Sequence, residues 1–326
     1  MKLARTTLFL VAALACCPLT ASAQAGYPAK PLRLVVPLPA GGPTDVFARQ
    51  YATRLSSAIG QPVVVENRTG ASGAIGTLEV KRAAPDGYTL LFGTASTHAL
   101  YGLLATKPQY DILLDFTHIA VLGGAPVVFA THPSLPPTLK GVLDLARMYP
   151  GKLQYGSPGE GTFLHLAAER LKREAGSLNI QHIPYRGSAQ SLPALIGGEV
   201  GMSVDTLGSA LPMYRAGKLK LVAQATRKRS ALAPEVPTVD EAIRIKGFEA
   251  TLWNVVSAPA KTPPEAIDVL AAATTRVMRD TTLHEQLAKL AIEPVSGSTP
   301  ATATEFVRQE IARWKPVVDA TGIKLD

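Results

Sequence analysis

Short apolar runs alternate with segments of helical periodicity along most of the chain. The runs are bounded by glycine, proline or polar residues, and the segments between them carry apolar residues at three- and four-residue spacing. Strands are predicted over Leu32–Val36, Pro62–Glu66, Tyr88–Phe92, Val127–Ala130, Lys152–Tyr155, His182–Tyr185, Val200–Val204, Leu219–Ala225 and Leu252–Ala258. Helices are predicted over Val46–Ile59, Ala74–Ala84, Leu139–Tyr149, Phe163–Ala175, Ala189–Ile196, Ala210–Arg215 and Val239–Ile245. This alternation predicts an α/β fold with parallel sheets and crossover helices.

The last part of the chain changes character, because the strand-like runs stop. The segments Pro264–Asp280, Leu283–Ala291 and Ala301–Ala320 all have helical periodicity. With 326 residues, of which 47% are hydrophobic, the chain can bury a large core. This length favours two lobes over one.

The N-terminus has the pattern of a secretory signal peptide. Lys2 and Arg5 precede the apolar run Leu8–Ala15, and Ala21-Ser22-Ala23 fits an A-x-A cleavage site. The apolar run is too short to span a bilayer, and no later run is long enough to do so. We therefore expect residues 1–23 to be removed on export. A lipoprotein attached through Cys16 is the alternative.

Composition argues against several classes of function. The net charge is +8, of which Lys2 and Arg5 supply part, and the longest basic run is only Arg227-Lys228-Arg229. Nucleic-acid binding is therefore not expected, whereas a diffuse positive field helps to collect anionic solutes. Both cysteines lie in the expected signal peptide, and the histidines lack metal-ligand spacing. We expect no metal and no cofactor.

A glycine-rich loop between the first strand and the first helix has the features of an anion site. Gly41 and Gly42 let a ligand approach the backbone closely, because no Cβ stands in the way. Pro43 suits the first helical position, where its missing N–H costs nothing. The amides and positive dipole end of the next turn attract a carboxylate. Asp45 either contacts the ligand or only complements the helix dipole.

Four loops that follow predicted strands are rich in glycine or hydroxyl residues. In open parallel sheets, ligands bind outside the carboxyl ends of strands. Two lobes that face each other across a cleft would bring these loops around one ligand, as in a clamshell binding protein. The loops are Ala40–Asp45, Gly93–Thr97, Gly156–Thr162 and Asp205–Ser209.

A secreted serine hydrolase is the main alternative function. Ser157, His165 and Asp205 have the residue types of a triad, but the nucleophile-elbow pattern Gly-x-Ser-x-Gly is absent. Arg186 follows a predicted strand and lies either near an anion or in a solvated turn. Trp253 is expected to pack in the core, with ligand stacking as the alternative.

The chain resembles the extracytoplasmic solute receptors of tripartite tricarboxylate transporters, often called Bug receptors. The resemblance covers nearly the whole mature chain. Its markers are Val35–Asp45, Val64–Arg68, Ala84–Leu91, His182–Gly187 and Val236–Thr238. It implies an α/β, two-lobed periplasmic binding protein of type II-like form, with lobe one at 27–127 and 253–326 and lobe two at 128–252.

The resemblance also implies a function and a set of contacts. The receptor would close on a small organic carboxylate and deliver it to a membrane permease, as a monomer without catalytic activity. A sensor that signals to a membrane partner remains an alternative. Leu38 stands where the family usually has Phe, and Tyr101–Asp115 departs from its Asn-Pro-rich pattern. The implied ligand contacts are Leu38, Ala40, Gly41, Gly42, Thr44, Asp45, Ser157, Gly159, Gly161, Thr162 and Asp205.

Overall fold

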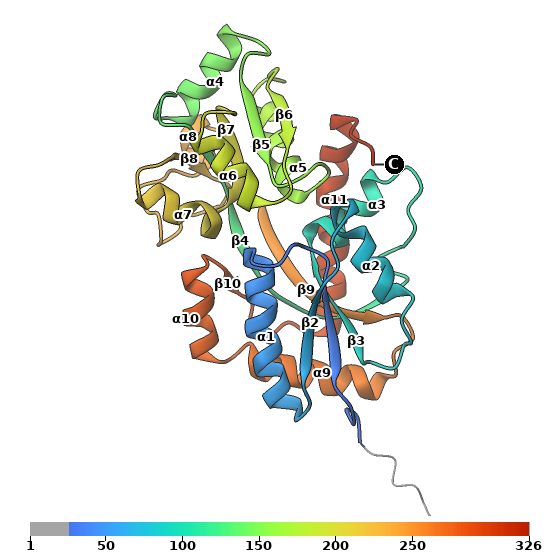
Figure 1. Cartoon of the computed structure of the whole chain (residues 1–326). Coiled ribbons are helices and arrows are strands. Elements are labelled where there is room, and N and C mark those ends of the chain that lie inside the picture. The colour runs from blue at the N-terminus through green and yellow to red at the C-terminus, as the bar shows by residue number, and fades with distance from the viewer. Residues whose placement is uncertain (1–25, 326) are drawn as a thin grey trace, which may run out of the picture.

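The fold consists of two α/β halves, which lie one above the other in Figure 1. The computed structural model describes residues 26–325. The expected signal peptide, with Cys16, lies outside these residues. Among the described residues, strands join in the order β2-β1-β3-β9-β4-β7-β5-β6, with β10 and β8 also paired to β4.

The lower half is built on a parallel core of three strands. β1 (Leu32–Val36) pairs with β2 (Val63–Asn67) on one side and with β3 (Thr89–Thr94) on the other. All of β3 is buried, and β1 is buried apart from the half-buried Arg33, as expected for a sheet covered on both faces. The surrounding helices are α1 (Pro43–Ile59), α2 (Ala74–Lys81), α9 (Pro264–Val277) and α10 (Thr281–Lys289).

Two antiparallel strands connect the halves. β4 (Phe116–Thr131) pairs with β9 (Thr251–Pro259) as far as Pro126, and from Val127 onward it pairs with β7 and β8. The prediction of uniformly parallel sheets was therefore wrong for β4 and β9. The predicted strand Val127–Ala130 is the end of a strand of 16 residues.

The upper half repeats the parallel arrangement. β5 (Gln154–Ser157) lies between β6 (Gln181–Pro184) and β7 (Met202–Thr206), and β8 (Lys220–Gln224) flanks β4. Its helices are α4 (Leu139–Met148), α5 (Phe163–Glu174), α6 (Ser188–Ile196), α7 (Leu207–Arg215) and α8 (Val239–Ile243).

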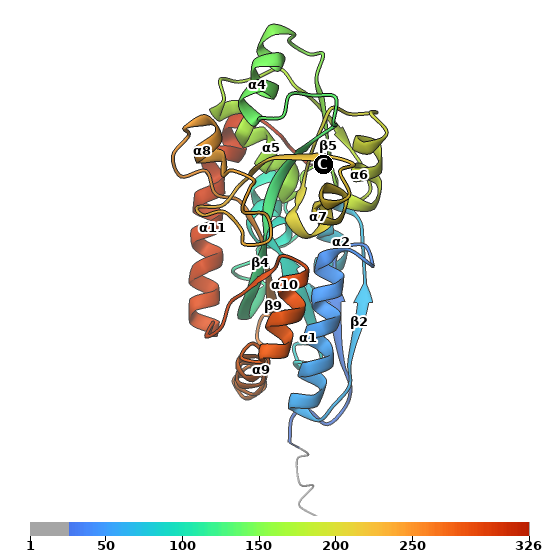
Figure 2. The same cartoon turned by 90° about the vertical axis from the view of Figure 1, so that its left-hand side faces the viewer.

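The C-terminal helix α11 (Pro300–Thr321) contacts both halves (Figure 2). Its Trp314 packs edge-to-face on Phe163 of α5, with ring centroids 4.6 Å apart. Its Glu310 accepts a hydrogen bond from the indole of Trp253 in β9 at 2.8 Å. Trp253 is thus a core residue, and it does not line the cavity described below.

The segment after β3 is helical, although the sequence predicted a loop there. Ser96–Leu100 form one π-helical turn, η2, and α3 (Tyr101–Leu104) follows directly. A short 3-10 turn, η1 (Ala71–Gly73), precedes α2, and a two-residue strand, β10 (Glu293–Pro294), pairs with β4. The remaining elements agree with the predicted ones to within a few residues.

Candidate functional site

The glycine loop leads into α1 as the sequence predicts, with Pro43 as the first helical residue. Gly42 is the N-cap and supplies no side-chain cap, so the N–H groups of the first turn have no partner inside the helix. Gly41 has φ +82°, which favours glycine, whereas Gly42 has φ −74°. The backbone therefore requires glycine at position 41 rather than at position 42.

Asp45 is fully engaged within its own half. Its carboxylate accepts the N–H of Gly41 at 2.9 Å, Nε of Arg49 at 3.0 Å and Nδ2 of Asn67 at 2.9 Å. Burial acts to raise the pKa of Asp45, but these hydrogen bonds outweigh it and lower the pKa below the ordinary value. Asp45 is therefore an ionised support for the loop.

The loop between β5 and α5 forms the facing wall. Thr162 is the N-cap of α5, because its Oγ1 accepts the N–H of His165 at 3.3 Å. Across the two halves, the N–H of Phe163 donates to Oγ of Ser96 at 3.0 Å. The π-helical turn of the lower half therefore contacts the start of α5 directly.

Asp205 lies at the end of β7 and is completely buried. Its carboxylate accepts hydrogen bonds from Oγ of Ser188 at 2.8 Å and from the N–H of Thr206 at 2.7 Å. Burial raises the pKa of Asp205 to about 6, and the hydrogen bonds offset only part of this effect. Asp205 thus holds Ser188 and Thr206 in place and is not open to solvent.

A cavity of about 510 Å³, the cleft cavity, lies between the two halves. Such a volume is in the usual range for small-molecule sites. Each of the four loops singled out in the sequence contributes to its lining. The lining residues from these loops are Ala40, Gly41, Gly42, Pro43, Thr44, Ser96, Pro158, Thr162, Thr206, Gly208 and Ser209.

The cleft cavity contains part of the predicted contact set. Leu38, Ala40, Gly41, Gly42, Thr44 and Thr162 line it. Asp45, Ser157, Gly159, Gly161 and Asp205 do not line it and lie in or beneath the same loops. The sequence did not single out the lining residues Ala125, Met213, Leu252, Asn254, Leu290 and Ile292.

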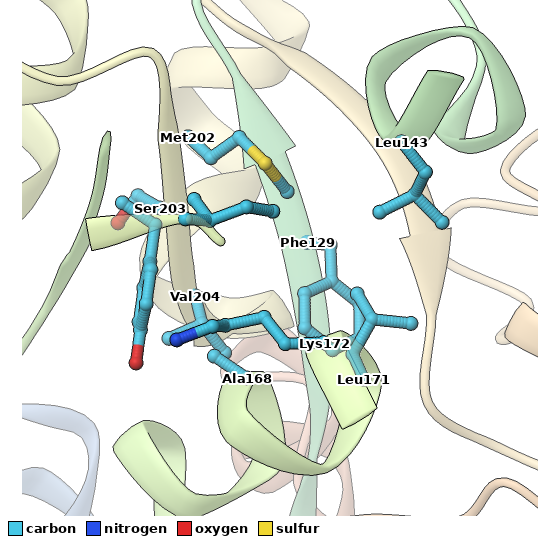
Figure 3. Close-up of a pocket in the computed structure, with 10 residues that line it drawn as sticks. Phe129, Leu143, Ala168, Leu171, Lys172, Met202, Ser203 and Val204 are labelled. Atoms are coloured by element: carbon cyan, nitrogen blue, oxygen red, sulfur yellow. The ribbon is translucent and has the colours of Figure 1, made fainter. Parts of the chain in front are cut away.

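A second, much smaller cavity lies inside the upper half (Figure 3). Figure 3 shows Phe129, Leu143 and Met202 among the side chains around it. Its volume of about 10 Å³ is close to the least that a single water needs. The cleft cavity is therefore the candidate ligand site.

Ser157 is not accessible from the cleft cavity, since it does not line it. Its Oγ lies 2.7 Å from Nε2 of His182 rather than next to His165, and the residue is completely buried. The His165 ring stacks on His182 at 3.8 Å, and its Nδ1 accepts the N–H of Gly161 at 3.0 Å. Burial lowers the pKa of His165 to about 3 and that of His182 to about 4. The pair holds the loop in place as neutral side chains.

Neither a metal site nor a membrane span is found in the described part of the chain. Residues 26–325 contain no group of three or more His, Cys, Asp or Glu side chains that could hold a metal ion. No helix within these residues is long and apolar enough to cross a bilayer.

Comparison with known proteins identifies the family. The model of the TctC family, described as tripartite tricarboxylate transporter family receptor, matches residues 47–323. The chain belongs to this family. It is 36% identical to Protein BugT of Bordetella pertussis over 301 residues, which is 92% of this chain and 91% of BugT. The resemblance to Bug receptors is thus confirmed.

Solved structures of similar proteins carry carboxylates. Rpa4515 of R. palustris, solved with adipate, is 34% identical, with a TM-score of 0.85 over 91% of this chain and 99% of its own. MatC of Rhodopseudomonas palustris, solved with bound malate, is 31% identical, with a TM-score of 0.83 over 90% of this chain and 100% of its own. The chain therefore has the predicted α/β, two-lobed fold of periplasmic binding proteins.

Proposed function

We propose that this receptor captures a small organic carboxylate in the cleft cavity and delivers it to the membrane permease of a tripartite tricarboxylate transporter. The observation that carries the proposal is the convergence of four loops, from both halves, on one cavity. The uncapped start of α1 opens onto that cavity. Helix N-termini favour anions, because their free N–H groups and dipole are positive.

We assign direct contacts to Leu38, Ala40, Gly41, Gly42, Thr44 and Thr162, because these residues line the cavity. The other predicted residues do not line the cavity, and they hold the loops around it in place through hydrogen bonds. Asp45 holds Gly41, and Asp205 holds Ser188 and Thr206. Ser157 holds the loop of Gly159 and Gly161 through its hydrogen bonds to Gly159 and His182.

Lobe one comprises residues 27–127 and 253–326, and lobe two comprises residues 128–252. The change of partner along β4 at Pro126 and Val127 supports this division. The two lobes move as bodies about β4 and β9, and the ligand shifts the population toward the closed arrangement. The mature protein works in the periplasm after cleavage of residues 1–23, as a monomer without cofactor or catalytic step.

A thermal-shift screen of the mature protein tests the carboxylate assignment. The panel contains mono-, di- and tricarboxylates, aromatic acids and amino acids. A specific ligand at a hundredfold excess over Kd stabilises the protein by about 2.7 kcal/mol. The proposal fails if amino acids or neutral compounds shift the melting temperature and no carboxylate does.

An ester panel separates the receptor from the hydrolase. We expect no turnover by the purified mature protein. Ester turnover that Ser157→Ala abolishes would contradict the receptor assignment, because Ser157 would then be a nucleophile.

A further inference from the structure

The lining of the cleft cavity contains one side-chain amide among residues 26–325, that of Asn254. Side chains alternate along β9, so that Leu252 and Asn254 line the cavity while Trp253 between them packs in the core. Only 2% of Asn254 is exposed. The strand thus places a buried polar side chain at the cavity, where burial without a hydrogen-bond partner carries a free-energy cost.

The amide of Asn254 has little bonding within the protein. Its Nδ2 donates to Gly93 O at 3.5 Å, which is long for a hydrogen bond, and no other bond of this side chain is found in the described chain. Its cross-strand neighbours are Gly123 of β4, which has no side chain, and Thr94 of β3. Oγ1 of Thr94 has no partner among the described residues either. Oδ1 of Asn254 is therefore available to a molecule in the cavity.

Gln224 is the other buried side-chain amide within residues 26–325, and it shows what a structural role requires. Its Nε2 donates to Ala233 O at 3.2 Å and to Val236 O at 2.7 Å, and its Oε1 accepts the N–H of Ser230 at 2.9 Å. Gln224 does not line the cavity. Asn254 has no comparable set of bonds, so the fold alone does not account for an amide at this position.

The chemistry of the amide selects the group that it can bind. Oδ1 accepts hydrogen bonds, and an ionised carboxylate has no proton to donate to it. A hydroxyl group donates one. An ammonium group also donates, but the described lining has no Asp or Glu to balance its charge and carries the cation Arg186. A hydroxyl is therefore the partner that fits both the amide and the charge of the cavity.

We propose that Asn254 is a specificity-determining residue that binds a hydroxyl group carried by the carboxylate solute. This inference rests on the proposed function and narrows it, because the solute is then a hydroxy acid, whatever the number of its carboxylates. The hydroxyl donates to Oδ1 of Asn254, and the start of α1 binds a carboxylate. A site built to bond a hydroxyl rejects the analogue that lacks it, since the buried amide is then left unpaired.

Calorimetry with matched pairs of solutes tests the assignment. The pairs are lactate and propionate, malate and succinate, and citrate and tricarballylate, and the members of each pair differ by one hydroxyl. In the pair that binds most tightly, the wild type should prefer the hydroxy acid by about tenfold, the cost of leaving one buried acceptor unpaired. The proposal is overturned if no pair shows this preference. Tighter binding of alanine than of lactate, or of aspartate than of malate, would also overturn it.

Asn254→Leu removes the amide at nearly the same size. This variant should bind the two members of that pair with affinities within about threefold of each other, because only the hydroxy acid loses a bond. Asn254→Ala should give the same loss of preference. Leu252→Ala is the matched control, since Leu252 lies on the same face of β9 and has no polar group. It should weaken both members equally. A preference kept in both Asn254 variants, or lost in Leu252→Ala, contradicts the assignment.

Melting curves of the empty proteins separate this role from a structural one. Asn254→Leu should melt no lower than the wild type. Gln224→Leu should melt lower, because it leaves three backbone groups without their partner. An equal drop in both variants would show that Asn254 supports the fold, and the assignment would fail.

The outcomes also separate this inference from the proposed function. If carboxylates bind but hydroxy acids have no advantage, the receptor function stands and this inference fails. If no carboxylate binds at all, both fail.

Discussion

The backbone N–H of Gly41 donates to the carboxylate of Asp45, with N and Oδ2 2.9 Å apart. This bond folds the glycine loop back onto the start of its own helix. The amide of Gly41 is therefore occupied, and a ligand carboxylate must use the amides that follow it. Asp45 therefore fixes the conformation of the glycine loop.

The two adjacent glycines should respond differently to substitution. Gly41→Ala forces a Cβ into a left-handed conformation and should cost about 1–2 kcal/mol of stability, although the space around it is open. Gly42→Ser is compatible with φ −74°, and its Cβ would lie at an ordinary 3.7 Å from Pro39 O. Its hydroxyl should cap α1, so that stability is kept while ligand affinity falls.

Urea unfolding and calorimetry of the two variants check this pair. Full affinity in Gly42→Ser would show that the start of α1 does not contact the ligand. Full stability in Gly41→Ala would show that the left-handed turn is not required.

Asp205 should make the folded protein less stable as the pH rises from 4 through 6. Its pKa is about 6 in the folded protein, against about 3.9 in an unfolded chain. The folded state therefore binds the proton more tightly, and this contribution is complete below pH 4 and is lost as pH rises through 6. The difference amounts to about 2–3 kcal/mol.

The variant Asp205→Asn isolates this effect. Its stability relative to the wild type should improve between pH 4 and pH 7, because asparagine does not ionise. Urea unfolding at both pH values measures the difference. A constant difference across this range would mean that Asp205 is ionised in the folded protein throughout.

The stacked histidines should act in the opposite direction. Both His165 and His182 are neutral in the fold, with pKa values of about 3 and about 4, mainly because of burial. An unfolded chain protonates histidine near pH 6.5, so stability is lost as pH falls from 6.5 toward these values. Each histidine should cost up to about 1.4 kcal/mol per pH unit.

His165→Gln should reduce the average slope between pH 7.5 and pH 5.5 by about half a proton, because an unfolded histidine is only partly protonated over this range. Unfolding free energies at pH 7.5 and pH 5.5 give the slope for each protein. An unchanged slope would show that His165 binds protons equally well in the folded and unfolded states, so that burial does not lower its pKa.

Ser72 bridges the cleft beside the cavity. Its Oγ donates to the carbonyl of Glu160 at 2.6 Å, and its own φ is +53°. Ser72→Ala should speed ligand dissociation by about two- to tenfold, the worth of one neutral hydrogen bond. Ser177→Ala is the control, because Ser177 is exposed and has a similar φ of +55°. Stopped-flow measurements give the dissociation rates. Equal rates for Ser72→Ala and the wild type would show that the hydrogen bond of Ser72 to Glu160 does not help to hold the lobes closed.

Local patterns in the sequence were sufficient for the order of the main helices and for the four segments that line the cleft cavity. They could not give strand direction, because alternation reveals where strands lie and not how they pair. The 16-residue β4 was predicted only in part, since Gly123, Gly124 and Pro126 are typical of strand ends. The π-helical turn at Ser96 was missed because glycine and hydroxyl residues around it favour a loop.

The apolar part of the cleft-cavity lining could not be predicted from the sequence for a related reason. Leu252, Leu290 and Ile292 have the apolar character of ordinary core residues. Only the pairing of β9 and β10 with β4 brings them to one cavity with a loop some 200 positions earlier in the chain. Arg186 could be named as a candidate, but its lack of an ion pair within the described chain required the structure.

A crystal structure of the mature protein with its tightest carboxylate tests the central claim most directly. The account predicts a carboxylate in the cleft cavity, with its oxygens at hydrogen-bond distance, about 3 Å, from N–H groups of the glycine loop and the first turn of α1. A carboxylate bound elsewhere, or one in the cavity that makes no contact with residues 40–45, would contradict it.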